Sequence, residues 1–285
     1  MTNVSERLFA ATLAVVLLLF ALVGCGGSGN ESPESGHETE TESGTQAATG
    51  REPLSTIHIN IGTDAKAPET DDPGDEESGV KLPLTLDMGT DYIDKFTFLC
   101  DFSIYGLKPH SMLSDGRNTD SVITGQGGSF YVMAEDQLVY SQEYGGLLTV
   151  DDFISRRRPE YLLVALGLSD ITTGSAPRHD DFGAAYAALL ERLKEASPKT
   201  IIICLSILPG SDGSGLSVYG AERYNARILS AAEDAGVYYL DAASAFAASN
   251  GYLRPDCDGG SSRLSTTGLK KLLDMIRTHY AGPEN

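Results

Sequence analysis

Basic side chains are scarce in this sequence of 285 residues, which has 21 Lys and Arg against 40 Asp and Glu. Binding to nucleic acid needs a basic surface that neutralises phosphates. The only dense run of positive charge is the three arginines at 156–158, and such a short run is typical of a solvated helix end. The composition therefore argues against a nucleic-acid partner.

The sequence also lacks a cluster of cysteines and histidines that could bind a metal. The chain has four Cys and five His, and none of them form a cluster at the spacing of a metal site. No internal repeat is present either. The sequence therefore predicts neither a metal centre nor another cofactor.

The acidic residues are concentrated near the N-terminus. Residues 26–80 contain 13 Asp and Glu and only 2 Lys and Arg, with almost no large apolar side chains. Such a segment cannot bury enough apolar area to offset its ordering entropy, so it predicts a disordered tether. Residues 57–61 alternate as a short strand would, but we expect this stretch to be loose as well.

The first residues predict export and anchoring. Leu8 to Val23 is a run of 16 uncharged residues, shorter than the ~18–20 residues of a comfortable membrane span. It ends in Leu-Val-Gly-Cys at 22–25, which resembles the lipobox of bacterial lipoproteins. The resemblance implies a signal peptide over 1–24, a lipid on Cys25, and attachment to the bacterial membrane outside the cytoplasm. The alternative is an uncleaved membrane anchor.

Residues 81–285 predict one domain with alternating strands and helices. Four apolar runs, at 96–100, 161–167, 200–208 and 237–240, are typical of a parallel sheet that is covered on both faces. Apolar residues at helical spacing lie at 182–193, 224–232 and 269–276, and Ser265 is a plausible N-cap. The pattern predicts a three-layer α/β/α, flavodoxin-like, doubly wound parallel sheet.

The segment 121–149 departs from this alternation. Short β-rich stretches at 122–124, 130–132 and 138–140 are separated by glycines. This arrangement predicts a strand followed by a hairpin insertion.

Candidate functional residues follow the strands, because ligands of open α/β sheets bind at the carboxyl ends of the strands. The first strand ends in Phe-Leu-Cys-Asp at 98–101, Tyr-Gly-Leu follows at 105–107, a later strand leads into Gly-Leu-Ser-Asp at 167–170, and Leu-Ser at 264–265 precedes the last helix. Over residues 90–281 the chain resembles the SGNH (GDSL-like) hydrolase superfamily. The resemblance implies an esterase-type fold with a catalytic serine, a histidine and an oxyanion site.

Several residues that the resemblance requires are replaced. The position of the nucleophilic serine holds Phe102, the oxyanion asparagine is Ser169, and the histidine position is Arg263. Gly125, Gly127 or Gly128 still match the glycine that donates to the oxyanion. Phenylalanine has no nucleophile, and arginine has no lone pair with which to accept a proton. We therefore expect a domain without hydrolytic activity that binds or scaffolds, with an acylated carbohydrate or a cell-wall component as its ligand.

Two alternatives remain open. Ser103 is the neighbouring hydroxyl and would make the chain an active esterase or carbohydrate deacetylase, with Asp258 in place of the missing acid and His110 as a conceivable base. A purely structural envelope protein would instead have a closed or filled cleft.

The cysteines allow one further prediction. If Cys25 carries lipid, then Cys100, Cys204 and Cys257 remain. Cys204 lies within an apolar strand and is expected to be a buried small hydrophobe. Cys100 ends the first strand and Cys257 begins the closing loop, and the loops there should meet at one end of the sheet, so the two are candidates for a disulfide.

Overall fold

The computed structural model describes residues 79–134, 137–172 and 178–282. The predicted signal peptide, Cys25 and the acidic tether with its stretch at 57–61 therefore lie outside the described residues. Among the helices within those three ranges, none is long and apolar enough to cross a membrane.

Five parallel strands form the central sheet. Its order is β2-β1-β5-β6-β7, and every neighbouring pair runs parallel. This is the flavodoxin-like order, in which the chain reverses direction across the sheet beside the first strand. The strands are β1 (Phe96–Cys100), β2 (Val122–Ile123), β5 (Tyr161–Ala165), β6 (Ile201–Leu205) and β7 (Tyr238–Leu240).

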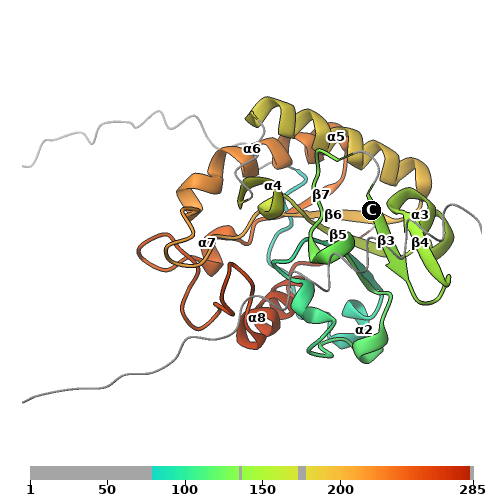
Figure 1. Cartoon of the computed structure of the whole chain (residues 1–285), viewed down its shortest axis with the longest axis horizontal. Helices are drawn as coiled ribbons and strands as arrows, with labels where there is room; N and C mark the ends of the chain where they lie inside the picture. Colours follow the sequence, from blue (N-terminus) through green and yellow to red (C-terminus); the bar gives the residue numbers. More distant parts are fainter. Residues whose placement is uncertain (1–78, 135–136, 173–177, 283–285) are drawn as a thin grey trace, which may run out of the picture. The chain divides into compact units, whose positions relative to one another are not determined.

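Helices cover both faces of the sheet, which confirms the predicted three-layer fold (Figure 1). One face is covered by α3 (Val150–Arg157), α5 (His179–Ala196) and α6 (Val218–Ala235). The other face is covered by α2 (Thr90–Ile93) and α8 (Thr266–Arg277). Two short helices, α4 (Leu168–Thr172) and α7 (Ala243–Phe246), follow β5 and β7.

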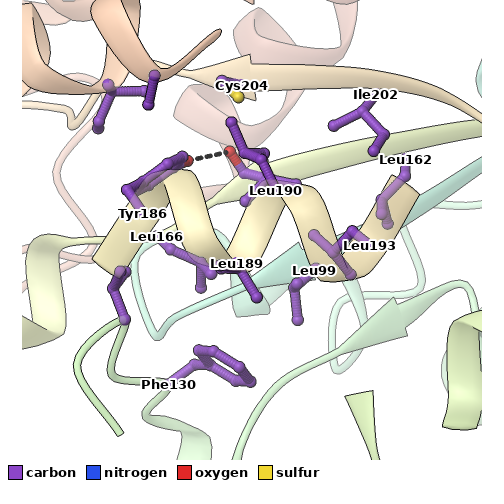
Figure 2. Close-up of a cluster of buried hydrophobic side chains, with 14 of the residues drawn as sticks. Leu99, Phe130, Leu162, Leu166, Tyr186, Leu189, Leu190, Leu193, Ile202 and Cys204 are labelled. Carbon is purple, nitrogen blue, oxygen red and sulfur yellow. Dashed lines mark hydrogen bonds between the residues drawn. The ribbon is translucent and has the colours of Figure 1, made fainter. Parts of the chain in front are cut away.

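Each face has its own apolar core. On the α5 face, the helical stripe that the sequence predicted packs against the strands, as Figure 2 shows for Tyr186, Leu189, Leu190 and Leu193. On the α8 face, Leu269, Leu272 and Ile276 pack with Phe96 and Leu163. Because the strands contribute side chains to both cores, they are apolar along their whole length.

The predicted cap of the last helix is confirmed. Ser265 precedes α8, and its Oγ accepts a hydrogen bond from the Gly268 N–H at 3.2 Å. That bond satisfies one of the N–H groups that a helix start leaves without a partner. The cap fixes the point at which the closing loop, which contains Arg263, turns into α8.

A β-hairpin is inserted after β2, but its strands differ in part from those predicted. β3 (Leu138–Ser141) pairs antiparallel with β4 (Gly146–Thr149). The prediction of strand structure at 130–132 is wrong. There the Tyr131 N–H donates to Gln137 Oε1 at 2.9 Å, and the Val132 N–H donates to Asp170 Oδ2 at 3.0 Å. These side-chain acceptors take donors that a strand would give to a neighbour.

Near the start of the described residues, Val80 and Leu82 bond to the last strand of the sheet. The Val80 carbonyl accepts from the Tyr239 N–H at 2.8 Å, and the Leu82 N–H donates to the Tyr239 carbonyl at 2.9 Å. The chain then runs to Asp87, whose carboxylate accepts two hydrogen bonds from Arg277 at the end of α8. The segment before α2 is thus tied to the sheet edge and to α8.

Candidate functional site

Asp101 lies directly after β1 and holds two loops of the site together. Its Oδ1 accepts from the Ser103 hydroxyl at 2.6 Å and from the Ser103 N–H at 3.0 Å, and its Oδ2 accepts from the Ser169 N–H at 3.2 Å. Burial raises the pKa of the Asp101 carboxyl, and these hydrogen bonds partly offset that rise. Asp101 therefore connects the loop after β1 to the start of α4.

Ser103 points into the protein rather than into the cleft. The residue is 7% exposed, and its hydroxyl is engaged by Asp101. Its carbonyl accepts from the Leu264 N–H at 2.9 Å, which connects the first loop to the closing loop. Among the described residues, no histidine is hydrogen-bonded to Ser103, so the structure does not assemble a serine–histidine pair around it.

Phe102 and Arg263 face each other across the site. The guanidinium carbon of Arg263 lies 5.4 Å from the centre of the Phe102 ring, which is within the range of a cation–π contact. The resemblance places a nucleophile and a histidine at these two positions. The loops do bring the positions together, but with side chains that cannot abstract or transfer a proton.

Two pockets share Phe102, Tyr105 and Arg263 in their walls. One has a volume of about 430 Å³ and is bounded on its far side by Pro109, His110 and the start of α8. The other has a volume of about 470 Å³ and extends to the glycine loop and the hairpin; its remaining lining residues are Lys108, Val122, Ile123, Thr124, Gly125, Gln126, Gly127, Gly128 and Tyr140. We refer to the second one as the glycine-loop pocket. The cleft of the fold is thus open.

The predicted oxyanion residues differ in their placement. Gly127 and Gly128 line the glycine-loop pocket, and both have a left-handed backbone, with φ of 75° and 84°. Gly125 also lines it, and a Cβ there would lie 2.2 Å from the Ser129 carbonyl oxygen, so the loop closes tightly on a glycine. Ser169, in contrast, is fully buried and lines neither of the two pockets.

The remaining catalytic candidates, Asp258 and His110, make other contacts. Asp258 accepts from the Ser211 hydroxyl at 2.8 Å and from the Gly260 N–H at 2.7 Å, so it braces the closing loop. His110 is exposed and lines the pocket of about 430 Å³. Within the described residues, neither side chain is hydrogen-bonded to Ser103.

The predicted disulfide is absent from the structure. Cys100 and Cys257 are both free and buried, as is Cys204. The Cys100 thiol donates to the carbonyl of Ile123 in β2 at 3.7 Å, and burial raises its pKa well above the usual range. Cys100 is thus directed at the neighbouring strand, and both residues belong to the α8-side core rather than to a loop crosslink.

Sequence reasoning included Tyr105 in the motif after the first strand but missed several polar residues of the glycine-loop pocket. Lys108, Thr124 and Tyr140 are among them. Lys108 lies seven residues after Asp101, which was an available signal. Tyr140 reaches the pocket from the inserted hairpin, and no local pattern shows that. Within the described residues, no group of three or more His, Cys, Asp or Glu could hold a metal ion.

A larger pocket, of about 680 Å³, lies elsewhere, between α6 and α7. Asn225 is among its lining residues, but both ends of the Asn225 amide are already bonded to the backbone of Ile207. We place the candidate site at the smaller pockets, because they contain the positions after β1 and before α8 where the fold carries its chemistry.

An open, doubly wound α/β domain with its cleft at the carboxyl ends of β1 and β2 defines the class of protein. Within that class, the sequence model of the GDSL-like Lipase/Acylhydrolase family matches residues 118–271. The chain belongs to this family. The match begins after β1, so Phe102 and Ser103 precede it, whereas Ser169 and Arg263 fall within it.

Similar solved structures share little sequence with the chain. A GDSL-like lipase of Bacteroides thetaiotaomicron is 15% identical, with a TM-score of 0.43 over 68% of this chain and 89% of the other. A family 3 carbohydrate esterase of Talaromyces cellulolyticus is 15% identical, with a TM-score of 0.41 over 64% and 93%. The C-terminal domain of Drosophila Oskar protein is 16% identical, with a TM-score of 0.42 over 70% and 93%. The search of curated proteins returned no match.

Proposed function

We propose that this chain is a cell-surface lipoprotein whose GDSL-like domain binds a ligand without hydrolysing it. The observation that carries the proposal is the contact between Phe102 and Arg263 at the centre of the cleft. Serine-type ester hydrolysis needs a nucleophile, a base that takes its proton and donors for the oxyanion, acting together. The first two are missing from the cleft at the positions where this family carries them.

Ser103 does not replace the missing nucleophile under this proposal. A serine hydroxyl is a weak nucleophile unless a base is placed beside it and the oxygen faces the substrate. The Ser103 hydroxyl is directed at buried Asp101, which also accepts two backbone N–H groups. Ser103 lines neither pocket of the cleft. Its hydrogen bond therefore supports a structural role.

The open cleft supports binding rather than a purely structural role. A domain that had lost all ligands would gain stability by filling the space that its active site once occupied. Pockets of about 430 and 470 Å³ remain on either side of Arg263. Tyr105 lines both pockets, and its ring and hydroxyl suit a sugar, which presents C–H faces and hydroxyl edges. We propose a carbohydrate of the cell envelope, acylated or not, as the ligand.

A reactivity test separates this proposal from the active esterase. The full chain in detergent is treated with a fluorophosphonate probe and, separately, with p-nitrophenyl acetate. We expect neither labelling nor turnover above the solvent rate. Labelling that disappears in Ser103→Ala would overturn the proposal and establish the hydrolase. As a gain-of-function arm, Phe102→Ser combined with Arg263→His restores two of the missing groups and should give measurable labelling.

The membrane partner and the location have their own test. Cells expressing the chain are grown with an alkyne-bearing fatty acid, and the protein is isolated and probed for the label. We expect labelling of the chain and its loss in Cys25→Ser, because only a cysteine thiol at this position accepts the lipid. Equal labelling of the two proteins would overturn the lipid anchor and leave the binding function of the cleft untouched.

A further inference from the structure

The glycine-loop pocket has an unusual balance of charge for this protein. Two cations, Lys108 and Arg263, line it, and no Asp or Glu does. Over residues 81–285, acidic side chains outnumber basic ones by 26 to 18. We propose that the pocket binds an anionic saccharide, a sugar that carries a carboxylate or a phosphate. This proposal rests on the binding function above and names the class of its ligand.

Neither cation forms a close ion pair within the described residues, although the charge of Lys108 acts on Asp120 from a greater distance. Six described basic residues form ion pairs with acids, among them Lys95 with Glu160 and Arg277 with Asp87. Across the described ranges, neither Lys108 nor Arg263 has an acid within ion-pair distance. Two positive charges that line one pocket, exposed Arg263 and half-buried Lys108, add their attraction for an anion at that place.

Phe102 prepares Arg263 for a ligand. The guanidinium carbon lies 5.4 Å from the centre of the Phe102 ring, and within the described residues the side-chain N–H donors of Arg263 have no hydrogen-bond partner. These donors match two oxygens of a carboxylate or a phosphate in a bidentate arrangement. The substitution of Phe for the nucleophile and of Arg for the histidine is thus one coherent change: it removes a catalytic pair and builds an oriented anion receptor.

A buried hydroxyl in the same pocket also lacks a partner. Thr124 follows β2, and its Oγ1 is buried with no hydrogen bond to any described residue. A buried polar atom without a partner carries a desolvation cost of about 1–3 kcal/mol. Because the oxygen is buried, a ligand bonds to it only if the Thr124 side chain turns toward the pocket.

The neighbouring aromatic side chain specifies a sugar rather than a bare ion. Tyr140 is 60% exposed, although it lines the pocket. It stands on β3 of the inserted hairpin, which Asp120 holds in place. An exposed ring at the rim of a cationic pocket provides an apolar face for a saccharide whose acidic group reaches Lys108 and Arg263.

The test measures binding to the full chain in detergent by titration calorimetry. The probes are D-glucuronate, D-glucose 6-phosphate, D-glucose and inorganic phosphate. We expect at least one of the two anionic sugars to bind at least tenfold more tightly than D-glucose and than inorganic phosphate. Whichever of D-glucuronate and D-glucose 6-phosphate binds more tightly shows whether the site prefers a carboxylate or a phosphate. Equal affinity for D-glucose would overturn the requirement for charge, and equal affinity for inorganic phosphate would overturn the requirement for a sugar.

Substitutions assign the effect to the pocket. Arg263→Gln and Lys108→Gln should each weaken binding of the anionic sugar at least fivefold. Arg263→Lys keeps the charge but loses the planar guanidinium that can bond two oxygens at once. Its affinity for the anionic sugar should lie between that of Arg263→Gln and that of the native chain. Arg223→Gln is the matched control, because Arg223 is exposed on α6 and lines neither pocket of the cleft. An equal loss in the control would overturn the assignment.

Failure of the inference and failure of the proposed function give different results. Turnover of p-nitrophenyl acetate would show that the domain hydrolyses esters and would overturn the proposed function. A higher affinity for the anionic sugars than for D-glucose would still support the inference about the ligand. Conversely, an inert domain that binds D-glucose as tightly as both anionic sugars would keep the binding function and lose the anionic ligand. Circular dichroism of each variant confirms that a loss of affinity does not reflect unfolding.

Discussion

The guanidinium carbon of Arg263 lies over the ring of Phe102, 5.4 Å from the ring centre. Phe102 follows β1, and Arg263 lies in the loop before α8, so more than 150 residues separate them along the chain. A hydrogen bond from the Leu264 N–H to the Ser103 carbonyl, at 2.9 Å, joins the residues that follow each of them. The contact is therefore fixed by the backbone on both sides.

Phe102→Leu tests the contribution of this contact. Leucine keeps an apolar side chain but lacks the negative ring face that attracts the guanidinium, a contact worth about 0.5–1 kcal/mol at an exposed site. We expect the affinity for the anionic sugar to fall roughly two- to fivefold, measured by calorimetry, because Arg263 is then less well oriented. An affinity equal to that of the native chain would show that Phe102 does not position Arg263.

Ser103→Ala should lower stability and change no activity. The substitution removes a buried hydrogen bond to a carboxylate, and such bonds contribute roughly 1.5–3 kcal/mol. We expect the free energy of unfolding in urea to fall by about that amount. Thr267→Ala, on an exposed position of α8, is the control and should stay within about 0.5 kcal/mol of the native chain. An unchanged free energy of unfolding in Ser103→Ala would show that the hydrogen bond from Ser103 to Asp101 does not stabilise the fold.

Two alanine substitutions in the glycine loop should differ. At Gly125 a Cβ would meet the Ser129 carbonyl oxygen at 2.2 Å, so the backbone must move. At Gly127 nothing lies within 4 Å, and the cost is the left-handed conformation alone, about 1–2 kcal/mol. We expect Gly125→Ala to cost more stability and to abolish sugar binding, as measured by thermal unfolding and calorimetry. The reverse order would contradict the packing of this loop.

Acid should loosen the hairpin that carries Tyr140. Burial alone would raise the pKa of Asp120, but hydrogen bonds from Glu143, Ser141 and Gln142, together with the charge of Lys108, lower it. Because this folded pKa lies below the value of about 3.9 in the unfolded chain, the carboxylate stabilises the fold above that pH. The stabilisation is lost as the pH falls through the folded pKa.

Asp120→Asn measures this contribution. Asparagine cannot ionise, so the free energy of unfolding of the variant should depend less on pH between about 5 and 2 than that of the native chain. Urea titrations at several pH values give both curves, and subtracting them removes the effect of other carboxyls. Parallel curves would show that the ionised Asp120 does not stabilise the hairpin.

The buried thiols give a direct check on the cysteines. Cys100, Cys204 and Cys257 are free and buried, so a thiol reagent should not label them in the folded chain. After unfolding without reductant, we expect mass spectrometry to find alkylation on each of these three cysteines. Alkylation of Cys204 alone among them, with Cys100 and Cys257 labelled only after reduction, would instead establish a disulfide between Cys100 and Cys257.

The sequence by itself determined the fold of the domain and the location of its cleft. Apolar runs such as 161–165 and 201–205 are buried on both faces, and the spacing of the α5 and α8 stripes follows from helical periodicity. These signals are local, because each depends on side chains a few residues apart. The same logic placed candidate residues after β1 and before α8.

Only the tertiary structure decided how those residues are used. Ser103 and Asp101 are two residues apart, yet no sequence pattern shows that the hydroxyl turns inward to a buried carboxylate. Lys108, Tyr140 and Arg263 come from three distant segments, and their shared pocket depends on how the loops and the hairpin close over the sheet. The side-chain directions of Cys100 and Cys257 likewise follow from packing against strands and helices that are remote in sequence.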